Sequence, residues 1–439
     1  MLLIAASIII PGLTHWRVHV IAFAPLHATW SPRVGPGTVP AILIALGAII
    51  WGPRAAATLP WHRLLAGAFV VGVAWLTALA TVDGWAGIGH ILDTSYEYLR
   101  TAREVAGRPF AETLDGYIPR ITHDPGKWPV HIAGHPPGAL LFFVVLVRLG
   151  LGSGLAAGWV VLVLAATTPV AVLITLRRLA AEGAARRAAP FLVLGPAAIW
   201  SAVSADAMFG TVGAWGLCCL AVAATTRGRW RLAAWAFLAG LLLGYCVMLS
   251  YGLPLLGIAA VAVLLLAGNW RPLLWAVGGA LAVVLGFAFW GFAWWEAYPV
   301  LRQRYYNGVA HKRPFSYWVW GNLGAFAISA GPLVGAGIGS AIAVLAGSVR
   351  RATGSARRLH AVLEARVAPA TILALAGFAM VLAADLSGMS KAEVERIWLP
   401  FAPWALIGTA LLPRGWRRPA LAGQLAFALV VQHVLATGW

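Results

Sequence analysis

Long apolar stretches, separated by short polar segments, recur along almost the whole chain and constrain its fold more than any other feature. A helix needs roughly 20 apolar residues, at about 1.5 Å each, to cross the hydrocarbon core of a bilayer. Several stretches are short or run into one another, so we expect about 11–13 transmembrane helices in a single all-α, polytopic membrane domain over residues 1–439. The stretches lie near 1–13, 38–52, 61–82, 154–176, 190–205, 208–226, 232–247, 250–268, 272–297, 318–347, 368–385, 397–412 and 419–437.

The composition agrees with a membrane protein and excludes several other classes. Hydrophobic residues make up 61% of the chain and charged residues 10%. A soluble domain typically has about 45–50% apolar and about 25% charged residues. The chain is therefore not an ordinary soluble enzyme, a disordered protein or a small disulfide-bonded scaffold.

The charge of the chain is strongly positive, with 32 lysines and arginines against 14 aspartates and glutamates. On a soluble protein such an excess would suggest nucleic acid as a partner. Here the basic residues gather in short segments between apolar stretches, which is typical of cytoplasmic loops. We therefore expect a multi-pass protein of the plasma membrane whose partner is the lipid bilayer and not nucleic acid. The cytoplasmic loops would be 53–63, 177–188, 227–231, 269–271, 349–366 and 413–418.

This topology places three polar loops on the outer face. The first, 83–136, contains seven of the fourteen acidic residues and four of the eleven histidines of the chain. Two smaller outer loops cover 298–317 and 386–396. The assignment requires that the apolar segment 136–152 does not cross the bilayer completely, so we expect this segment to lie in the interface or to re-enter.

Three carboxylates of the first outer loop are candidates for a catalytic base. Asp83 directly follows an apolar stretch, so a helix end would hold its carboxylate at the depth of a lipid phosphate. Asp93 and Glu97 are four residues apart and would share one face of a helix. Simpler interpretations remain: Asp83 merely ends a span, and the other two belong to a solvated amphipathic helix.

Further residues of the three loops are suited to binding a phosphate or a sugar. Guanidinium groups match phosphate oxygens, and aromatic faces match sugar rings. The same residues could instead form an aromatic belt with anchoring cations, an ion pair at a helix end, or packed loop histidines. The candidate binding residues are His131, His135, Arg302, Arg304, Tyr305, Tyr306, Lys391, Glu395 and Arg396.

Metal binding is not implied by these residues. Two loop histidines are too few for a zinc site without a nearby third ligand. The acidic residues are numerous enough to bind a divalent ion, but no ligand spacing requires one. We therefore expect no cofactor.

On one membrane face these groups could hold a lipid-linked phosphate together with a polar acceptor. A carboxylate would remove the proton from an acceptor hydroxyl as that hydroxyl attacks a sugar carbon. The cations would stabilise the departing lipid phosphate. The chemistry that fits the residues is glycosyl transfer.

Several segments resemble the GT-C superfamily of membrane glycosyltransferases. They are the apolar stretch before the acidic loop, Asp83 near its end, His135-Pro136-Pro137-Gly138, and Arg177-Arg178 after the next span. In the protein O-mannosyltransferase branch the corresponding loop carries an acidic motif and an HPP stretch. The chain departs from that branch because it has no adjacent Asp-Glu pair in the loop and has Gly138 where leucine is usual.

Segments 304–308 and 387–400 are similar to actinobacterial membrane proteins of this superfamily, among them the methylthioxylose transferase that decorates lipoarabinomannan. The resemblance implies a polyprenyl-phosphate-linked sugar donor, an outward-facing active site and a loop carboxylate as base. The acceptor would be a hydroxyl of a cell-envelope glycan or lipoglycan, and the sugar a pentose such as methylthioxylose, or mannose.

Two other functions stay open on the sequence. The chain could be a transporter or lipid-linked sugar flippase, or a non-catalytic scaffold of an envelope-synthesis complex. A proton- or ion-coupled transporter usually has a carboxylate at mid-bilayer depth, whereas almost all carboxylates here lie at the ends of apolar stretches or in the loops. The base stays open among Asp83, Asp93 and Glu97, and the helix-end position favours Asp83.

Overall fold

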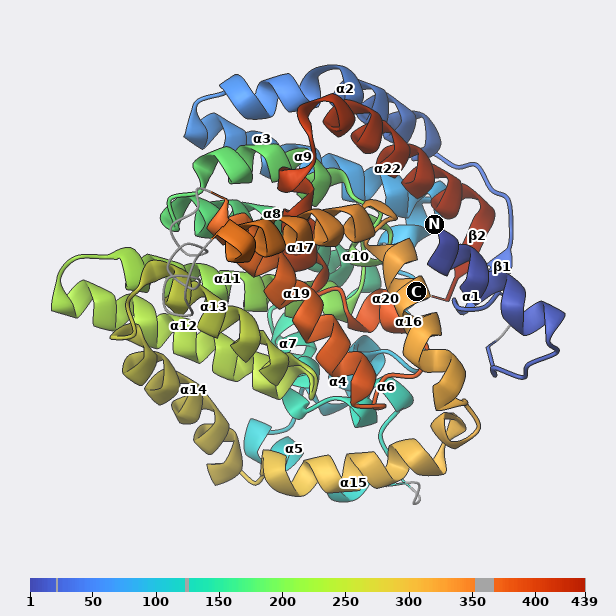
Figure 1. Cartoon of the computed structure of the whole chain (residues 1–439). Coiled ribbons are helices and arrows are strands. Elements are labelled where there is room, and N and C mark those ends of the chain that lie inside the picture. The colour runs from blue at the N-terminus through green and yellow to red at the C-terminus, as the bar shows by residue number, and fades with distance from the viewer. Residues whose placement is uncertain (21–22, 123–125, 352–366, 439) are drawn as a thin grey trace.

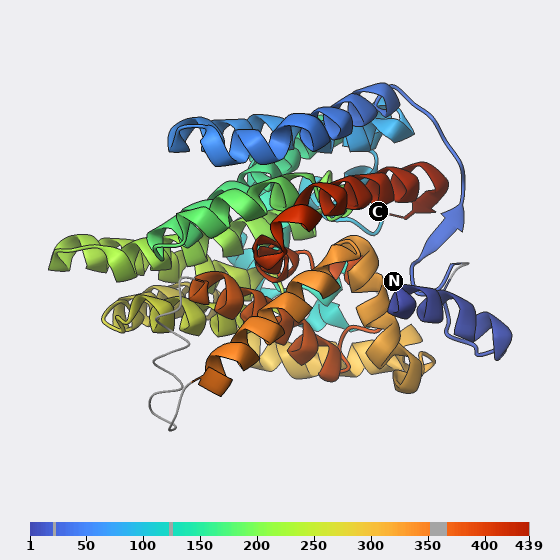
Figure 2. The same cartoon turned by 45° about the horizontal axis from the view of Figure 1, so that its top comes forward.

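The structure, a computed structural model, describes residues 1–20, 23–122, 126–351 and 367–438. Helices account for 76% of the chain, which confirms the all-α class. The described strands are β1 (Ala28–Trp30) and β2 (Leu435–Thr437), an antiparallel pair that joins the N-terminal and C-terminal segments. Figures 1 and 2 accordingly show the two ends of the chain near one another. His123 and Asp124 of the acidic loop, and most of the loop 349–366, lie outside the described residues.

Eight of the described helices are long and apolar enough to cross a membrane, which confirms the membrane character. The expected number of about 11–13 crossings is reached only if shorter or interrupted helices also cross. The shorter apolar helices are α1 (Leu2–Leu13), α7 (Pro137–Arg148), α13 (Leu256–Ala267) after η5 (Leu253–Leu255), and α21 (Ala402–Leu406) with η7 (Ile407–Leu411). The eight long helices are α2 (Thr38–Thr58), α3 (Trp61–Ala80), α8 (Gly154–Arg178), α11 (Ala205–Thr225), α12 (Arg229–Leu249), α14 (Pro272–Phe289), α17 (Leu333–Arg351) and α19 (Ala368–Leu386).

Three of the expected apolar stretches are each interrupted at a glycine. Gly291 (φ 101°) and Gly331 (φ 89°) adopt left-handed backbone, and Gly195 is followed by a proline. Such residues end a helix without a change in hydropathy. The stretch 272–297 forms α14 and α15 (Trp294–Asn307), 318–347 forms α16 (Phe315–Ser329) and α17, and 190–205 lies in α9 (Glu182–Leu194), α10 (Ala198–Ser201) and the start of α11.

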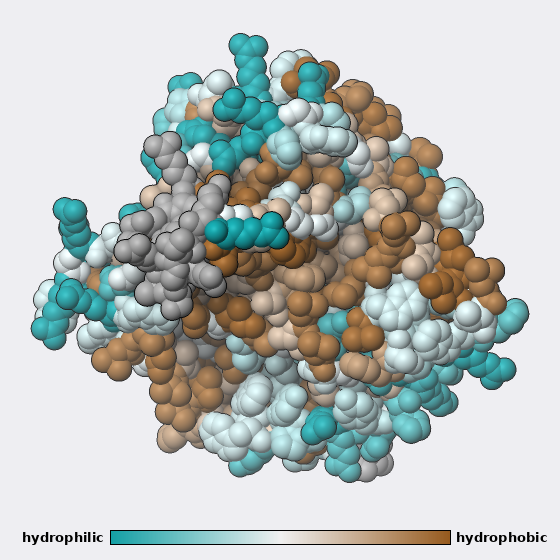
Figure 3. Space-filling view, viewed as in Figure 1, coloured by the Kyte–Doolittle hydropathy of each residue, from teal (hydrophilic) through white to brown (hydrophobic). Residues whose placement is uncertain are grey.

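Three of the basic segments, 53–63, 177–188 and 413–418, lie close together at one face of the molecule. The guanidinium of Arg186 donates to the carbonyl oxygens of Ala56 and Leu59 (2.9 Å each), and that of Arg187 donates to the carbonyl oxygen of Ala410 (2.9 Å). From this basic face α22 (Arg414–Val434) leads to the opposite, polar-loop face, which carries residues 83–136, 298–317 and 386–396. Figure 3 shows hydrophilic residues at the upper left and lower right, with a hydrophobic band between them.

The acidic segment folds into short helices rather than a free loop. Its helix α4 (Tyr98–Val105) lies beside α7, which has 12 residues and so is only about 18 Å long. The N-terminus of α7 directly follows this segment, and near its C-terminus Arg148 donates to the carbonyl oxygen of Ala106 (2.9 Å). Both ends of α7 therefore lie next to the acidic segment, an arrangement that fits a helix which does not cross the bilayer completely. The other elements of the three loops are η1 (Thr81–Asp83), η2 (Trp85–Ile88), η3 (Ile91–Asp93), α5 (Phe110–Asp115), η4 (Pro119–Ile121), α6 (Val130–Gly134), η6 (Val309–His311) and α20 (Val394–Ile397).

One expectation about the acidic segment is wrong, because Asp93 and Glu97 do not share a helix face. Asp93 is the last residue of η3, Thr94 is extended (ψ 158°), and Glu97 immediately precedes α4. The Thr94 hydroxyl donates to the carbonyl oxygen of Ile91 (2.7 Å). This side-chain hydrogen bond competes with helix formation, and the two carboxylates lie in different surroundings.

Candidate active site

Asp83 ends the turn η1 that directly continues α3. Its carboxylate is paired with Arg33 and accepts a hydrogen bond from Gln432 Nε2 (3.1 Å), and the side chain is 40% exposed. It borders a cavity of about 280 Å³ between the ends of α3 and α22, the segment 87–96 and α10, which we name the Asp83 cavity. The polar side chains that line it are Arg33, Asp83, His90, Thr94, Tyr96, Gln432 and Thr437.

The small β-sheet holds Arg33 in this cavity. The backbone N–H groups of Ser31 and Arg33 donate to the carbonyl oxygens of Val434 (2.9 Å) and His433 (2.8 Å), just beyond the β1–β2 pair. The Arg33 Nη1 group also donates to the carbonyl oxygen of Ser31 (3.2 Å), and Nε donates to Asp83. The N-terminal segment thus brings a guanidinium to the carboxylate at the end of α3.

Asp93 lies in a second, separate environment. Its carboxylate pairs with Arg103, and the Arg103 Nε group donates to the carbonyl oxygen of Gly152 (2.8 Å). Asp93 also lies directly against Gly154, where any side chain would collide with the carboxylate. Both partners of the ion pair are about two-fifths exposed. Asp93 therefore attaches the acidic segment to the start of α8, and it does not line the Asp83 cavity.

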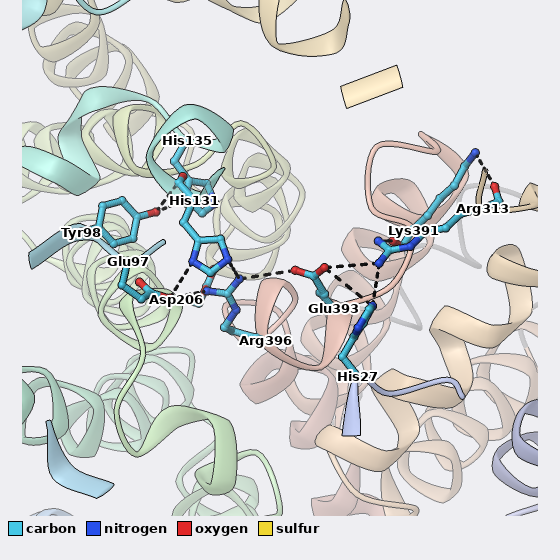
Figure 4. Close-up of polar contacts among 10 residues, drawn as sticks. All are labelled: His27, Glu97, Tyr98, His131, His135, Asp206, Arg313, Lys391, Glu393 and Arg396. Atoms are coloured by element: carbon cyan, nitrogen blue, oxygen red, sulfur yellow. Dashed lines mark hydrogen bonds and ion pairs between the residues drawn. The ribbon is translucent and has the colours of Figure 1, made fainter. Parts of the chain in front are cut away.

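Glu97 lies in a third environment, a buried group of charges that we name the Arg396 cluster (Glu97, His131, Asp206 and Arg396; Figure 4). The Arg396 Nη1 group is 3.3 Å from both Glu97 Oε1 and Asp206 Oδ2. His131 Nδ1 is 2.8 Å from Glu97 Oε1, and its Nε2 is 3.3 Å from Arg396 Nη2. All four residues are at most 9% exposed. Three distant parts of the chain, the acidic segment, α11 and α20, meet at this point.

The ionisation of the Arg396 cluster follows from these contacts. Burial acts to raise the pKa of Glu97, but the hydrogen bond from His131 and the nearby charges of His131 and Arg396 lower that pKa below its ordinary value. Burial acts to lower the pKa of Arg396, but the carboxylates of Asp206 and Glu97 raise it. Glu97 and Arg396 therefore form a buried ion pair.

His135 lies beside the Arg396 cluster and is uncharged. Its Nδ1 atom forms a hydrogen bond with the Tyr98 hydroxyl, and its ring packs edge-on against Phe209. Burial, followed by the charges of Arg396 and His131, lowers the pKa of His135 to about 3. The hydroxyl of Tyr117 donates to the carbonyl oxygens of Ile132 (2.7 Å) and His135 (3.0 Å). His135 thus helps to hold the turn between α6 and α7.

The cations predicted to bind phosphate are largely engaged by backbone. Arg304 donates to the carbonyl oxygens of Ile121 (2.5 Å) and Trp128 (3.4 Å). Lys391 Nζ donates to the carbonyl oxygens of Ala310 and Arg313 (3.1 Å each). These bonds attach α15 and the loop 386–396 to their neighbours, so Arg304 and Lys391 are structural in this arrangement.

The other predicted residues of these loops have different exposures. The Tyr305 hydroxyl accepts a hydrogen bond from the Lys391 N–H (2.9 Å). The exposed guanidinium of Arg302 lies 6.0 Å from the centre of the Tyr306 ring. Glu395 is fully buried. Arg302 presents its cation at the surface, and none of the four residues Arg302, Tyr305, Tyr306 and Glu395 lines the Asp83 cavity.

Glu393 connects the Arg396 cluster to a second group of charges (Figure 4). Its carboxylate lies 3.9 Å from Arg396 Nη2, 3.6 Å from Arg313 Nη2 and 4.0 Å from His27 Nε2. Ala392 and Glu393 both have positive φ, 72° and 62°, a conformation that is costly for residues with a Cβ. Asn322 stabilises this backbone conformation, because its Oδ1 atom accepts a hydrogen bond from the Ala392 N–H group (3.1 Å).

The sequence analysis did not identify Arg33, Gln432 or His27. All three lie outside the three polar loops. Arg33 and Gln432 meet Asp83 beside the paired terminal segments, and His27 lies next to Arg313 and Glu393. A weak signal was present for Gln432, which is a polar residue within the last apolar stretch. Tyr96 and His90 belong to the acidic segment and line the Asp83 cavity.

The carboxylates and histidines of the described residues include no group of three that could hold a metal ion. Comparison of the chain with family models, with curated proteins and with solved structures gave no match.

Proposed function

We propose that the protein is a GT-C-like membrane glycosyltransferase. It would move a sugar from a polyprenyl-phosphate donor to a hydroxyl of a cell-envelope glycan or lipoglycan, at the outward face of the plasma membrane. The observation that supports this most is the Asp83 cavity, where a carboxylate at the end of a membrane helix lies beside a guanidinium, a histidine and a tyrosine. In this proposal some of the shorter helices also cross, which gives a span count in the GT-C range.

The proposed chemistry assigns roles to five side chains of the cavity. The Asp83 carboxylate accepts the proton of the acceptor hydroxyl while the hydroxyl oxygen forms a bond to the anomeric carbon. The bond from that carbon to the donor's phosphate oxygen breaks, and its electron pair leaves with the lipid phosphate. Arg33 stabilises the charge that develops there. Gln432 and His90 can bond to sugar hydroxyls, and the Tyr96 ring can pack against the sugar.

The contacts of Asp83 leave capacity for this role. One carboxylate oxygen is bonded to Arg33 and the other to Gln432, but each oxygen of a carboxylate has two lone pairs. Glu97 is a poorer base because its buried carboxylate is paired with Arg396 and His131. Of the three predicted carboxylates, Asp83 is the one that combines a cavity, partial exposure and a neighbouring cation.

The proposal is tested by measuring sugar transfer from a labelled polyprenyl-phosphate donor in membranes with wild type, Asp83→Asn or Asp93→Asn protein at matched levels. We expect Asp83→Asn to reduce transfer by about 10²–10⁴-fold, the range for loss of a general base. Asp93→Asn is the matched control, since it removes an equally exposed, arginine-paired carboxylate, and it should retain most activity. Equal transfer by all three proteins would refute Asp83 as the base.

A transporter or lipid-linked sugar flippase is the second candidate. One observation favours it, since charges buried within membrane proteins often mark transport pathways, and Glu97, Asp206 and Arg396 are buried together. Arg396 is paired with both carboxylates, which fits a structural role as well. Movement of a lipid-linked sugar across proteoliposomes without any transfer to acceptor would favour the flippase. A non-catalytic scaffold would be indicated if Asp83→Asn cells kept an unchanged envelope.

A further inference from the structure

Three cavities follow one another along α3. The first, of about 350 Å³, lies between α2, α3 and α9, and α3 contributes Leu64, Gly67 and Val71 to its wall. The second, of about 60 Å³, contacts the next part of the helix at Gly72 and Leu76. The third is the Asp83 cavity. Figures 1 and 2 both show α2 and α3 together at one side of the bundle.

The character of the lining changes along this row. Every residue that lines the first cavity is apolar, and the second is lined mostly by small side chains, among them Ala198 and Ser201. The third contains the charged pair Arg33 and Asp83. From Leu64 to Asp83 a helix rises about 28 Å, close to the thickness of the hydrocarbon core. The row therefore extends from a charged end at the polar-loop face through the apolar depth of the bilayer.

We propose that the isoprenoid chain of the lipid donor lies along α3, with its phosphate on Arg33 and its distal part in the groove between α2, α3 and α9. The inference rests on the proposed function and adds the position of the lipid. Arg33 uses its Nε group on Asp83 and one hydrogen of Nη1 on Ser31. A guanidinium has five N–H donors, so Arg33 can bind a phosphate oxygen without releasing Asp83.

Small side chains line the narrow middle part of this path. Gly72, Ala198 and Ser201 surround the middle cavity, and Val193 lines both the first and the second. A Cβ placed on Gly67 would have no atom within 4 Å, so the groove is open beside this residue.

Charge distinguishes this path from a larger apolar groove. That rival groove, of about 790 Å³, lies between α5, α7, α12 and α14. The cavity next to it is lined by Glu112 and Asp115, and both carboxylates would repel a lipid phosphate. The nearby Arg108 is paired with Glu112, and Arg148 donates to backbone carbonyl oxygens. A phosphate is therefore favoured at Arg33 rather than at the end of the rival groove.

Filling each groove in turn tests the inference. Gly67→Trp fills the groove along α3, and Gly286→Trp is its matched control in the rival groove, because a Cβ at Gly286 also has open space. Transfer is measured with a long-chain polyprenyl-phosphate sugar and with its two-isoprene analogue. We expect Gly67→Trp to reduce transfer from the long-chain donor at least about tenfold more than from the short one, which corresponds to the loss of about two buried methylene groups.

The same experiment has outcomes that overturn the inference. Equal effects of Gly67→Trp on both donors, or a chain-length-dependent defect in Gly286→Trp, would exclude the path along α3. Binding of long-chain polyprenyl phosphate to purified protein in nanodiscs separates this inference from the transferase proposal. If wild type binds the lipid but transfers no sugar, the proposed function fails, while weaker lipid binding by both Gly67→Trp and Arg33→Gln still supports the path. Unchanged binding by both variants rejects it.

Discussion

The Asp83 cavity and the Arg396 cluster use the same residue types in opposite ways. Both contain a carboxylate, an arginine and a histidine from distant parts of the chain. Around Asp83 the groups line a cavity and keep part of their bonding capacity. Around Arg396 they are buried and paired with one another. A group of charged side chains is thus suited to chemistry where a cavity lets a ligand reach it. The same group is suited to a structural role where burial and mutual pairing leave no space for a ligand.

The two regions are in contact, so the position of one affects the shape of the other. Tyr96 lines the Asp83 cavity, and its ring lies edge-on to His131 at 5.5 Å between centres. The next residue, Glu97, is held by Arg396. The Arg396 cluster therefore helps to position one wall of the Asp83 cavity.

The largest effect on stability is expected from Arg396→Ala. Removing one member of a buried ion pair leaves the others uncompensated and typically costs about 3–5 kcal/mol. The free energy of unfolding in detergent measures this loss, and Arg302→Ala is the control because Arg302 is exposed on the same face. If Arg396→Ala folded as stably as wild type but lost transfer, the cluster would be the reaction site and the comparison would be reversed.

An intermediate effect on stability is expected from a change of pH, because His135 binds a proton more readily in the unfolded chain than in the folded protein. The folded protein binds a proton there only near pH 3, whereas the ordinary pKa of the group is 6.5. Between these two pH values the unfolded chain binds more protons at His135 than the folded protein does. The contribution of His135 to the free energy of unfolding is therefore fully present above pH 6.5 and decreases as the pH falls toward 3. The slope from this group approaches about 1.4 kcal/mol per pH unit.

The variant His135→Asn should remove that slope from unfolding curves recorded between pH 6.5 and 5. His311→Asn, at an exposed histidine of the same face, should leave the slope as in wild type. An unchanged slope in His135→Asn would mean that His135 titrates normally and is not enclosed.

The smallest effect is expected from Asp93→Asn. The pair with Arg103 is about two-fifths exposed, and such pairs contribute about 0–1 kcal/mol. The unfolding free energy should change by no more than this. A loss of several kcal/mol would place Asp93 with the buried charges of the Arg396 cluster rather than with the exposed pairs.

Much of the architecture was predictable because apolar stretches and basic segments report directly on a membrane environment. The long helices α2, α3, α8, α11, α12 and α19 coincide with expected stretches. The breaks at Gly195, Gly291 and Gly331 were not predicted, since a glycine hardly changes the hydropathy of a stretch. The prediction that Asp93 and Glu97 share a helix face was wrong for a local reason, the hydrogen bond that the Thr94 side chain donates to the backbone.

The sequence by itself determined a polytopic all-α membrane protein, the clustering of its basic segments, and a polar face with Asp83 at the end of a span. The tertiary structure alone decided which charges meet. Arg33 and Gln432 are about 400 residues apart, yet the β1–β2 pair brings both to Asp83. Glu97 and Arg396 are 299 residues apart and bury each other. Charge pairing and burial depend on distances in space, and residue spacing along the chain does not encode those distances for segments that are far apart.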